Sequence, residues 1–333
     1  MTRYYRPICQ GGANRPKEAH VLAGGWTWFT HVEVLERNTA PRVISTSEVP
    51  DDKLRRLTAP RAPICGIEIA RPSVMGILNI TPDSFSDGGQ FDSVDSVVAR
   101  ASAMVKQGAD ILDIGGESTR PGAETVSIED EISRVVPVIS AIRGAMSAPI
   151  SIDTRKSAVA EAALAAGAGL VNDVSAFGYD KAMAGYVAAT DAPVCLMHAQ
   201  GSPETMQNDP TYQNVVLDVY DALSERVAKA EAAGISRDRI LVDPGIGFGK
   251  TLDHNLALLR NISLFHGLGC AILLGVSRKK FIGTLSGAEV ASERVAGTIG
   301  VTLGAVMQGV QMHRVHDTKE VNEAMSLWAA AYL

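Results

Sequence analysis

The chain has 333 residues, 46% of them apolar, and its 31 Lys and Arg against 37 Asp and Glu give a formal charge of −6. This length fits two ordinary domains or one large α/β barrel, and the apolar content excludes a chain that is mostly disordered. The mildly acidic balance argues against nucleic-acid binding, which requires clustered basic residues. The four cysteines form no C-x-x-C pair, so we expect a reduced, cytoplasmic protein with neither disulfides nor a zinc site.

No apolar stretch follows the N-terminal arginines, so the sequence predicts no signal peptide. The uncharged run Val295–Met312 is near the lower limit of length for a membrane span. It contains four glycines and several polar residues, which favour a buried helix followed by a strand. We therefore expect no membrane partner.

Residues 1–60 are rich in aromatic side chains and differ in pattern from the rest of the chain. The alternation in Trp26–Leu35 indicates a strand, and Pro50 followed by two aspartates indicates the start of a short helix. Prolines at 60 and 63 mark a linker, and Cys65–Ile69 is a candidate hairpin strand that would plug a barrel floor. We divide the chain into an N-terminal extension, 1–60, whose role the sequence does not reveal, and a second unit, 61–333.

From about residue 74, short apolar runs alternate with helical patterns, as in repeated βα units. The predicted strands are Val74–Asn79, Asp110–Ile114, Ile150–Asp153, Gly169–Asn172, Val194–Met197, Ile240–Asp243, Ala271–Leu274 and Met312–His316. Ser127 is placed to cap a helix that contains Pro137 and ends near Gly144, and another helix is predicted from about Tyr212 to Gly234. Eight such units predict the α/β class and a (β/α)8 TIM barrel with an N-terminal extension; the alternative is an open, doubly wound sheet.

Polar side chains end several of these strands, where the active site of such a barrel lies. Three are the carboxylates of Asp113, Asp153 and Asp243, and Asn172 adds an amide. One aspartate at a strand end can simply cap the next helix. Three at equivalent positions, with the amide, suit a heterocycle whose edge carries several N–H donors.

Cationic residues gather at the last two strands. Arg314 and His316 alternate on one strand, so their side chains share a face and are candidates for an anion site. Ser277-Arg278-Lys279 follows the preceding strand, where barrels often bind phosphate. The glycine-rich loop before Lys250 is not a Walker motif, because Pro244 replaces the leading glycine; we interpret it as a loop that presents Phe248 to a ligand.

Several motifs together resemble the dihydropteroate synthases. The two longest are VMGILNITPDSFSDGG at 74–89 and ADILDIGGESTRPGA at 109–123. The match continues in family order through Ser151–Thr154, Asn172-Asp173, Leu196–His198, Asp243–Gly245, Ser277–Lys279 and Arg314–Asp317. The resemblance covers about residues 72–332 and leaves the N-terminal extension outside it.

The resemblance implies condensation of 6-hydroxymethyl-7,8-dihydropterin diphosphate with p-aminobenzoate, giving 7,8-dihydropteroate and diphosphate in folate synthesis. It implies catalytic roles for Asp113, Asp153, Asp243 and Lys279. It places Asp113, Asp153, Asn172, Met197, Asp243, Phe248 and Lys279 around the pterin. It places Asn79, Arg120, Arg314 and His316 at the diphosphate, with Mg²⁺ bound by Asn79. It places Phe85, Thr119, Pro121, Ser277 and Lys279 at the aminobenzoate.

The same resemblance implies a homodimer and a sulfonamide target. Two rival functions remain open at this point. A pterin-binding methyltransferase domain would share the barrel and its carboxylates but would not need the predicted diphosphate site. A non-catalytic pteridine-binding protein would be expected to lack the anion-binding residues.

Overall fold

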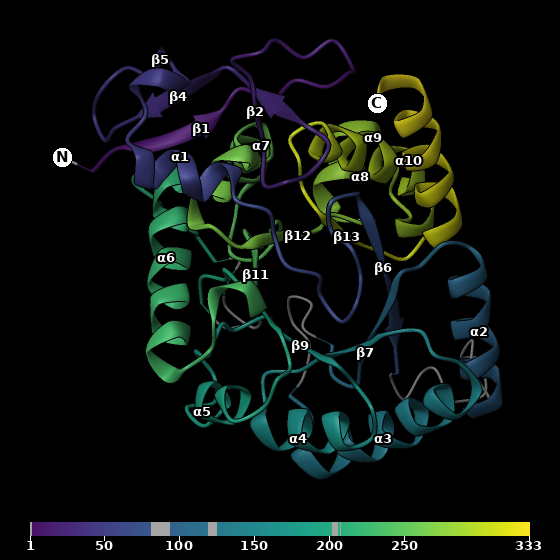
Figure 1. Cartoon of the computed structure of the whole chain (residues 1–333). Helices are drawn as coiled ribbons and strands as arrows, with labels where there is room; N and C mark the ends of the chain where they lie inside the picture. The colour runs from purple at the N-terminus through teal and green to yellow at the C-terminus, as the bar shows by residue number, and fades with distance from the viewer. Residues whose placement is uncertain (1, 81–93, 119–124, 202–205, 207) are drawn as a thin grey trace.

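Eight parallel strands close into a barrel in the computed structural model, which describes residues 2–80, 94–118, 125–201, 206 and 208–333 (Figure 1). The strands are β6 (Ser73–Asn79), β7 (Ile111–Gly115), β8 (Ile150–Asp153), β9 (Leu170–Asp173), β10 (Val194–Met197), β11 (Ile240–Asp243), β12 (Ala271–Gly275) and β13 (Met312–Val315). Pairing of β13 with β6 closes the circle, with Met312 opposite Ser73. The predicted TIM barrel is confirmed, and each predicted strand lies within one residue of its observed position.

Helices follow the strands and surround the barrel (Figure 1). They are α2 (Val94–Lys106), α3 (Ile128–Ala145), α4 (Ser157–Ala165), α5 (Met183–Ala188), α6 (Val215–Ala233), α7 (Leu252–Arg260), α8 (Lys280–Ser286), α9 (Val295–Val306) and α10 (Thr318–Tyr332). Short 3-10 helices add η3 (Arg237–Arg239), η4 (Ile262–Leu268) and η5 (Ala291–Arg294). The uncharged run from Val295 is therefore a helix followed by a strand, as predicted. Among the described residues, no helix is long and apolar enough to cross a membrane.

Local capping explains where the predicted helices begin. The Ser127 hydroxyl accepts a hydrogen bond from the Asp130 N–H at 3.0 Å, and the helix continues past Pro137 to Ala145. The helix expected from about Tyr212 instead begins at Val215, because the Asn214 side chain caps it.

The barrel interior is closed at one end by the segment before β6. Ile64, Ile67 and Ile69 are buried against apolar residues that point inward from the strands, such as Met75 and Leu241. A bridge between Ile64 and Ile67 forms the turn of this plug. The segment plugs the barrel floor as predicted, but it forms this single bridge instead of the expected hairpin strand. Polar ligands therefore have access from the opposite end, where the strands finish.

The N-terminal residues form an antiparallel sheet in the order β1 (Tyr4–Pro7), β4 (His31–Leu35), β5 (Arg42–Ser45), and a small β2–β3 pair (His20–Val21, Trp28–Phe29). The short helices η1 (Thr46–Glu48) and α1 (Asp51–Thr58) complete this extension. It has its own apolar cluster, which includes Phe29 and Val32, and it lies against the barrel beside α6 and α7 (Figure 1). The division of the chain at residue 60 stays a prediction.

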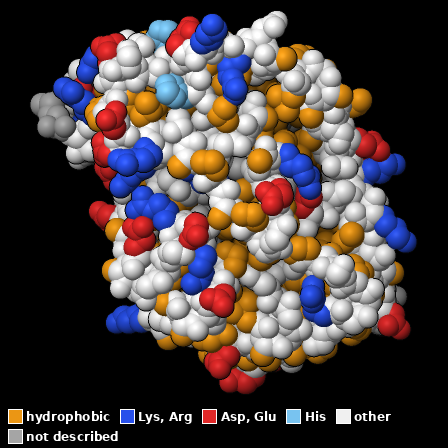
Figure 2. Space-filling model, viewed as in Figure 1, with side chains coloured by type: hydrophobic (Ala, Val, Ile, Leu, Met, Phe, Trp, Pro, Cys, Tyr) orange, Lys and Arg blue, Asp and Glu red, His pale blue; other side chains and the backbone are white. Residues whose placement is uncertain are grey.

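Specific contacts fix the extension to the barrel. The Tyr4 hydroxyl donates to the Asp221 carboxylate at 2.9 Å, and the Trp26 indole N–H donates to the Val306 carbonyl at 2.8 Å. Arg37 bridges Asp218 and Asp221 on α6 at 2.6 and 2.7 Å. On the face seen in Figure 2, basic and acidic side chains are interspersed rather than gathered into patches of one sign.

Candidate active site

Polar side chains from neighbouring strands meet inside the open end of the barrel. The parallel register sets Asp153 opposite Asn172, and Asp113 on the adjacent strand lies opposite Ser151, two residues before Asp153. Their exposed fractions are 5%, 3% and 0%. The Asn172 amide N–H donates to Asp113 Oδ2 at 3.2 Å, so these three predicted pterin residues form one connected group.

Arg314 joins this group from β13. Its Nε donates to Asp113 Oδ2 at 2.5 Å, and its Nη2 donates to Asp153 Oδ2 at 2.8 Å. Burial raises the pKa of Asp153 above its ordinary value, and the neighbouring Arg314 opposes that rise. The sequence predicted a diphosphate role for Arg314; the structure places its guanidinium on the two carboxylates.

Each of these carboxylates has one oxygen without a donor among the described residues. Asp113 Oδ1 and Asp153 Oδ1 are buried and accept no hydrogen bond from any residue that the structure describes. An unpaired buried acceptor is costly, because folding removes its water without supplying a partner. The pair is therefore suited to a ligand that brings N–H donors into the barrel.

Asp243 and Lys279 form the other side of the site. Asp243 is 5% exposed and its Oδ1 accepts from the Gly245 N–H at 2.7 Å. Burial raises the pKa of Asp243, and Lys279 opposes that rise. Burial lowers the pKa of Lys279 to about 8, with Asp243 acting in the opposite direction. Each of the two groups therefore favours the charged form of the other.

Apolar groups accompany this pair. The Lys279 ammonium lies 4.4 Å from the centre of the Phe248 ring and donates to the Ile246 carbonyl. Met197 ends β10 directly opposite Asp243 in the barrel register and is 4% exposed. An aromatic face and a thioether beside buried carboxylates suit a flat heterocycle.

Ser277 and His316 are brought together at the ends of β12 and β13. The Ser277 hydroxyl lies 3.0 Å from His316 Nδ1 and accepts from the His316 backbone N–H at 3.1 Å. Arg278, between Ser277 and Lys279, adopts a positive φ of 58° and pairs with Asp317. This turn sends Arg278 to Asp317 while Lys279 reaches Phe248.

Asn79 ends β6 opposite Gly115, next to the carboxylate group. A Cβ placed on Gly115 would lie 3.5 Å from the Asn79 Oδ1 and 3.5 Å from the Asp153 Cβ, so Asn79 and Asp153 flank the same glycine. Four other predicted site residues, Phe85, Thr119, Arg120 and Pro121, lie outside the described residues.

Two groups of buried charges near the site were not identified from the sequence. Glu117, Glu131, Arg155 and Lys156 form an ionic cluster beside β7 and β8. Lys250 lies 3.0 Å from His198 Nδ1 and donates to the Phe248 carbonyl at 2.9 Å. The linear signals for these groups are weak: Lys156 follows Asp153 by three residues and Lys250 follows Phe248 by two, while Glu117 and His198 fall inside motifs of the resemblance without an assigned role.

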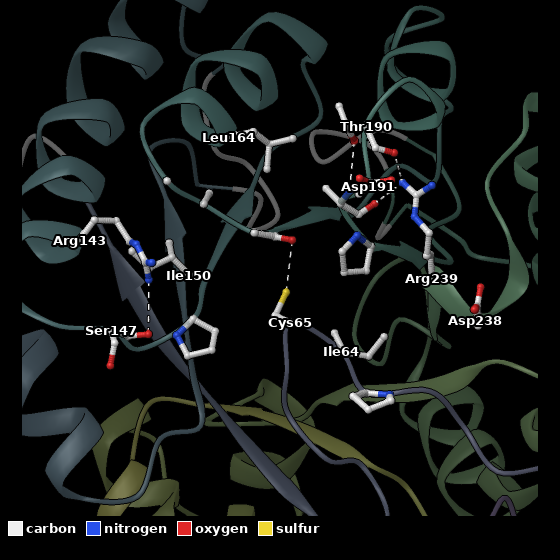
Figure 3. A pocket seen from close by; sticks show the side chains of 17 residues that line it. Ile64, Cys65, Arg143, Ser147, Ile150, Leu164, Thr190, Asp191, Asp238 and Arg239 are labelled. Atoms are coloured by element: carbon white, nitrogen blue, oxygen red, sulfur yellow. Dashed lines mark hydrogen bonds between the residues drawn. The ribbon is translucent and has the colours of Figure 1, made fainter.

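A pocket of about 650 Å³ lies at the other end of the barrel, where the strands begin (Figure 3). Cys65 donates from Sγ to the Gly169 carbonyl at 3.2 Å, and Arg143 donates to the Ser147 carbonyl at 3.4 Å. Arg239 donates to backbone carbonyls that include that of Thr190. The pocket does not include the carboxylates described above, so it is separate from the candidate active site.

Known proteins match both the sequence and the fold. The model of the pterin binding enzyme family matches residues 75–316. Dihydropteroate synthase of Escherichia coli K12 is 46% identical over 259 residues, covering 78% of this chain and 91% of that protein. The enzyme of Neisseria meningitidis serogroup B is 47% identical over 269 residues, covering 79% and 94%.

Solved structures of dihydropteroate synthases are similar in fold to this chain. A Yersinia pestis dihydropteroate synthase, determined with a sulfonamide drug complex, has a TM-score of 0.76 and 43% identity, covering 80% of this chain and 96% of that one. A Xanthomonas albilineans dihydropteroate synthase in complex with 7,8-dihydropteroate has a TM-score of 0.72 and 42% identity, covering 79% and 94%. With its barrel and its carboxylate-lined mouth, this chain belongs to the dihydropteroate synthase family of pterin binding enzymes.

Proposed function

We propose that the protein joins 6-hydroxymethyl-7,8-dihydropterin diphosphate to p-aminobenzoate, releasing diphosphate and forming 7,8-dihydropteroate for folate synthesis. The observation that carries this proposal is the buried group Asp113, Asp153 and Asn172, in which two acceptor oxygens have no donor among the described residues. The N–H-rich edge of a pterin supplies the donors that these oxygens require.

In this proposal the pterin lies across the barrel mouth. The carboxylates of Asp113, Asp153 and Asp243 accept hydrogen bonds from its polar edge, and the amide of Asn172 both accepts and donates. Met197 and Phe248 pack on its faces. Lys279, beside Asp243 and Phe248, contacts the same ring and borders the second substrate. The buried setting strengthens each of these polar contacts because water does not compete for them.

Binding of the pterin leaves the partners of Arg314 in place. Its guanidinium hydrogen-bonds Asp113 Oδ2 and Asp153 Oδ2 at 2.5 and 2.8 Å, whereas the pterin N–H groups meet the Oδ1 atom of each carboxylate. The guanidinium has further N–H donors, which serve the diphosphate together with His316 and Arg120.

We favour a dissociative reaction. The cationic residues stabilise negative charge on the departing diphosphate. The electron-rich pterin and the nearby carboxylates stabilise positive charge on the exocyclic methylene carbon. The arylamine nitrogen, held by Ser277, Lys279, Phe85, Thr119 and Pro121, then forms the new C–N bond and loses a proton.

The donor set fits Mg²⁺ as a cofactor. Among the described residues, no group of three or more His, Cys, Asp or Glu side chains is arranged to hold a metal ion. Mg²⁺ needs few protein ligands where substrate phosphates and waters complete its octahedron. We assign the amide oxygen of Asn79 to this role, and when bound the ion would neutralise charge on the diphosphate.

The decisive experiment is turnover of both substrates with Mg²⁺, together with calorimetry of pterin binding. Asp243→Ala removes a charge-assisted contact and is expected to weaken transition-state binding by about 2–4 kcal/mol while the protein stays folded. Pterin binding without formation of dihydropteroate would instead favour the methyltransferase or non-catalytic alternatives. Unchanged pterin affinity in the folded variant would overturn the role of Asp243.

We also propose a cytoplasmic homodimer. Exposed apolar side chains on the α8–α10 side of the molecule support self-association: Leu285, Val290, Met307, Leu327 and Tyr332 are between 55% and 72% exposed. Figure 2 shows hydrophobic atoms at the surface in this region. Analytical ultracentrifugation of the full chain tests the dimer, and a single species of 35.2 kDa would overturn it. The four free thiols support a reducing compartment.

A further inference from the structure

The loop that follows β11 presents an aromatic ring to the candidate active site. It runs from residue 244 to residue 250 and carries Phe248, whose half-buried ring has its centre 4.4 Å from the Lys279 ammonium. Gly247 and Gly249, on either side of Phe248, have positive φ angles of 83° and 63°. Glycines leave the backbone many alternative conformations, so the position of the ring depends on contacts from outside the loop's own backbone.

Lys250 supplies such a contact. It is 3% exposed, and its Nζ donates to the Phe248 carbonyl at 2.9 Å and to the His198 carbonyl at 3.3 Å. The same nitrogen lies 3.0 Å from His198 Nδ1. Burial and the neighbouring Lys250 lower the pKa of His198 to about 3, so the imidazole is neutral and its Nδ1 can accept from the amine. The amine therefore joins Phe248 to His198.

His198 is a firm attachment point for this connection. It directly follows Met197, the last residue of β10, and its backbone N–H donates to the Asp243 carbonyl at 2.9 Å. Its ring centre lies 6.1 Å from that of Tyr212. Lys250 thus ties the loop to the ends of the two strands that carry Met197 and Asp243.

Other side chains hold the two neighbours of Phe248. Asn255 Oδ1 accepts from the Gly247 N–H, and the Tyr212 hydroxyl donates to the Gly249 carbonyl, both at 2.7 Å. Within the part of the chain that the structure describes, Lys250 is the side chain that hydrogen-bonds the backbone of Phe248 itself. Loss of the amine is therefore expected to release the ring while the rest of the loop stays attached.

We propose that Lys250 is a positioning residue for the pterin, which fixes the Phe248 ring by joining its backbone to His198. Burial of an amine costs free energy, and what its hydrogen bonds add is direction, because each one fixes a donor relative to an acceptor. The proposal rests on the proposed function, in which Phe248 packs on a face of the pterin. Lys250 contacts no substrate in this scheme, so its loss should weaken pterin binding through the ring alone.

A double-mutant cycle in the full chain tests this route, with the affinity for the pterin diphosphate measured by calorimetry. Lys250→Met should weaken the affinity at least fivefold, which is the size of one lost aromatic contact. In the Phe248→Ala background the same substitution should change the affinity less than twofold, because no ring remains to be positioned. A purely electrostatic effect of the amine on Asp243 would instead weaken binding equally in both backgrounds.

Arg239→Met is the matched control. Arg239 also donates to backbone carbonyls, those of Val187, Thr190 and Ala192, but it lines the pocket at the end of the barrel where the strands begin. The control should keep the pterin affinity within twofold of wild type. A loss as large as that of Lys250→Met would show a general effect of removing such a cation and would overturn the positioning role.

A loss of less than fivefold in the wild-type background, or of twofold or more in the Phe248→Ala background, also overturns it. If Lys250→Met does not fold, Lys250→Gln, which keeps a donor on a shorter side chain, decides by the same cycle with threefold in place of fivefold. Absence of turnover in a wild-type protein that binds the pterin overturns the proposed function and leaves the cycle measurable, which keeps the two failures distinct.

Discussion

Removal of the Arg314 guanidinium tests the electrostatics of the barrel mouth. Arg314 is the described cation that hydrogen-bonds both Asp113 and Asp153, whose exposed fractions are 0% and 5%. The variant Arg314→Met keeps much of the volume but leaves these carboxylates without their partner. Breaking a buried ion pair in this way costs about 3–5 kcal/mol, so we expect a loss of that size in the free energy of unfolding at pH 8.

The loss in free energy of unfolding caused by Arg314→Met should be smaller at acidic pH. Burial holds the pKa of Asp153 above its value in the unfolded chain, and Arg314 opposes this rise. Without Arg314 the folded-state pKa rises further, so the folded variant binds a proton over a pH range in which the unfolded chain does not. Stability of the variant relative to wild type is therefore lowest above the folded-state pKa of the variant, and it recovers as the pH falls to the folded-state pKa of wild type, about 7.

Urea unfolding followed by tryptophan fluorescence, at pH 8 and at pH 5.5, measures this difference. Arg71→Met is the matched control, because Arg71 pairs with Asp110 at the surface with its side chain 63% exposed. That pair is expected to contribute about 1 kcal/mol or less. A loss for Arg314→Met as small as the control, or one that is the same at both pH values, would refute the reasoning.

Three further predictions follow from particular contacts. Trp26→Ala removes the hydrogen bond to Val306 and part of the packing of the extension. It should lower the free energy of unfolding by about 2 kcal/mol in urea titrations. The KM values for the pterin diphosphate and for p-aminobenzoate should stay within threefold of wild type. Burial lowers the pKa of Lys250 to about 7, so between this value and about 10 the unfolded chain binds a proton that the folded chain does not. The stability of the wild type therefore falls as the pH falls through this range. Lys250→Met should lose this pH dependence, which denaturation of both proteins at pH 7 and pH 9.5 measures. Asn79→Ala should raise the Mg²⁺ concentration needed for half-maximal turnover at least tenfold while pterin binding measured without Mg²⁺ is unchanged.

The barrel could be predicted because its signals are local. Runs such as Ile240–Asp243 are apolar up to their last residue and occur at the spacing of βα units, so each strand is recognisable without knowledge of its neighbours. The floor plug was also predictable, since it falls between a linker and the first strand. The start of α6 was not, because both Tyr212 and Val215 fit the helical stripe and only the Asn214 cap selects the later one.

Side-chain partners were harder to predict than positions. Residues at strand ends were identified as site residues, but nothing in the sequence pairs Arg314 with Asp113, which is 201 positions away. Charge and strand alternation predicted an inward-facing cation and left its partner open. In the structure, the guanidinium of this cation hydrogen-bonds two protein carboxylates.

Glu117 and Lys156 show the same limit more sharply. Neither was expected to be a direct ligand, so a sequence searched for ligands does not identify their ion pair. Their contact depends on two adjacent parallel strands ending in register and on α3 returning Glu131 to the same point. Because such a cluster is defined by three-dimensional convergence alone, a single sequence does not reveal which of its charges are paired.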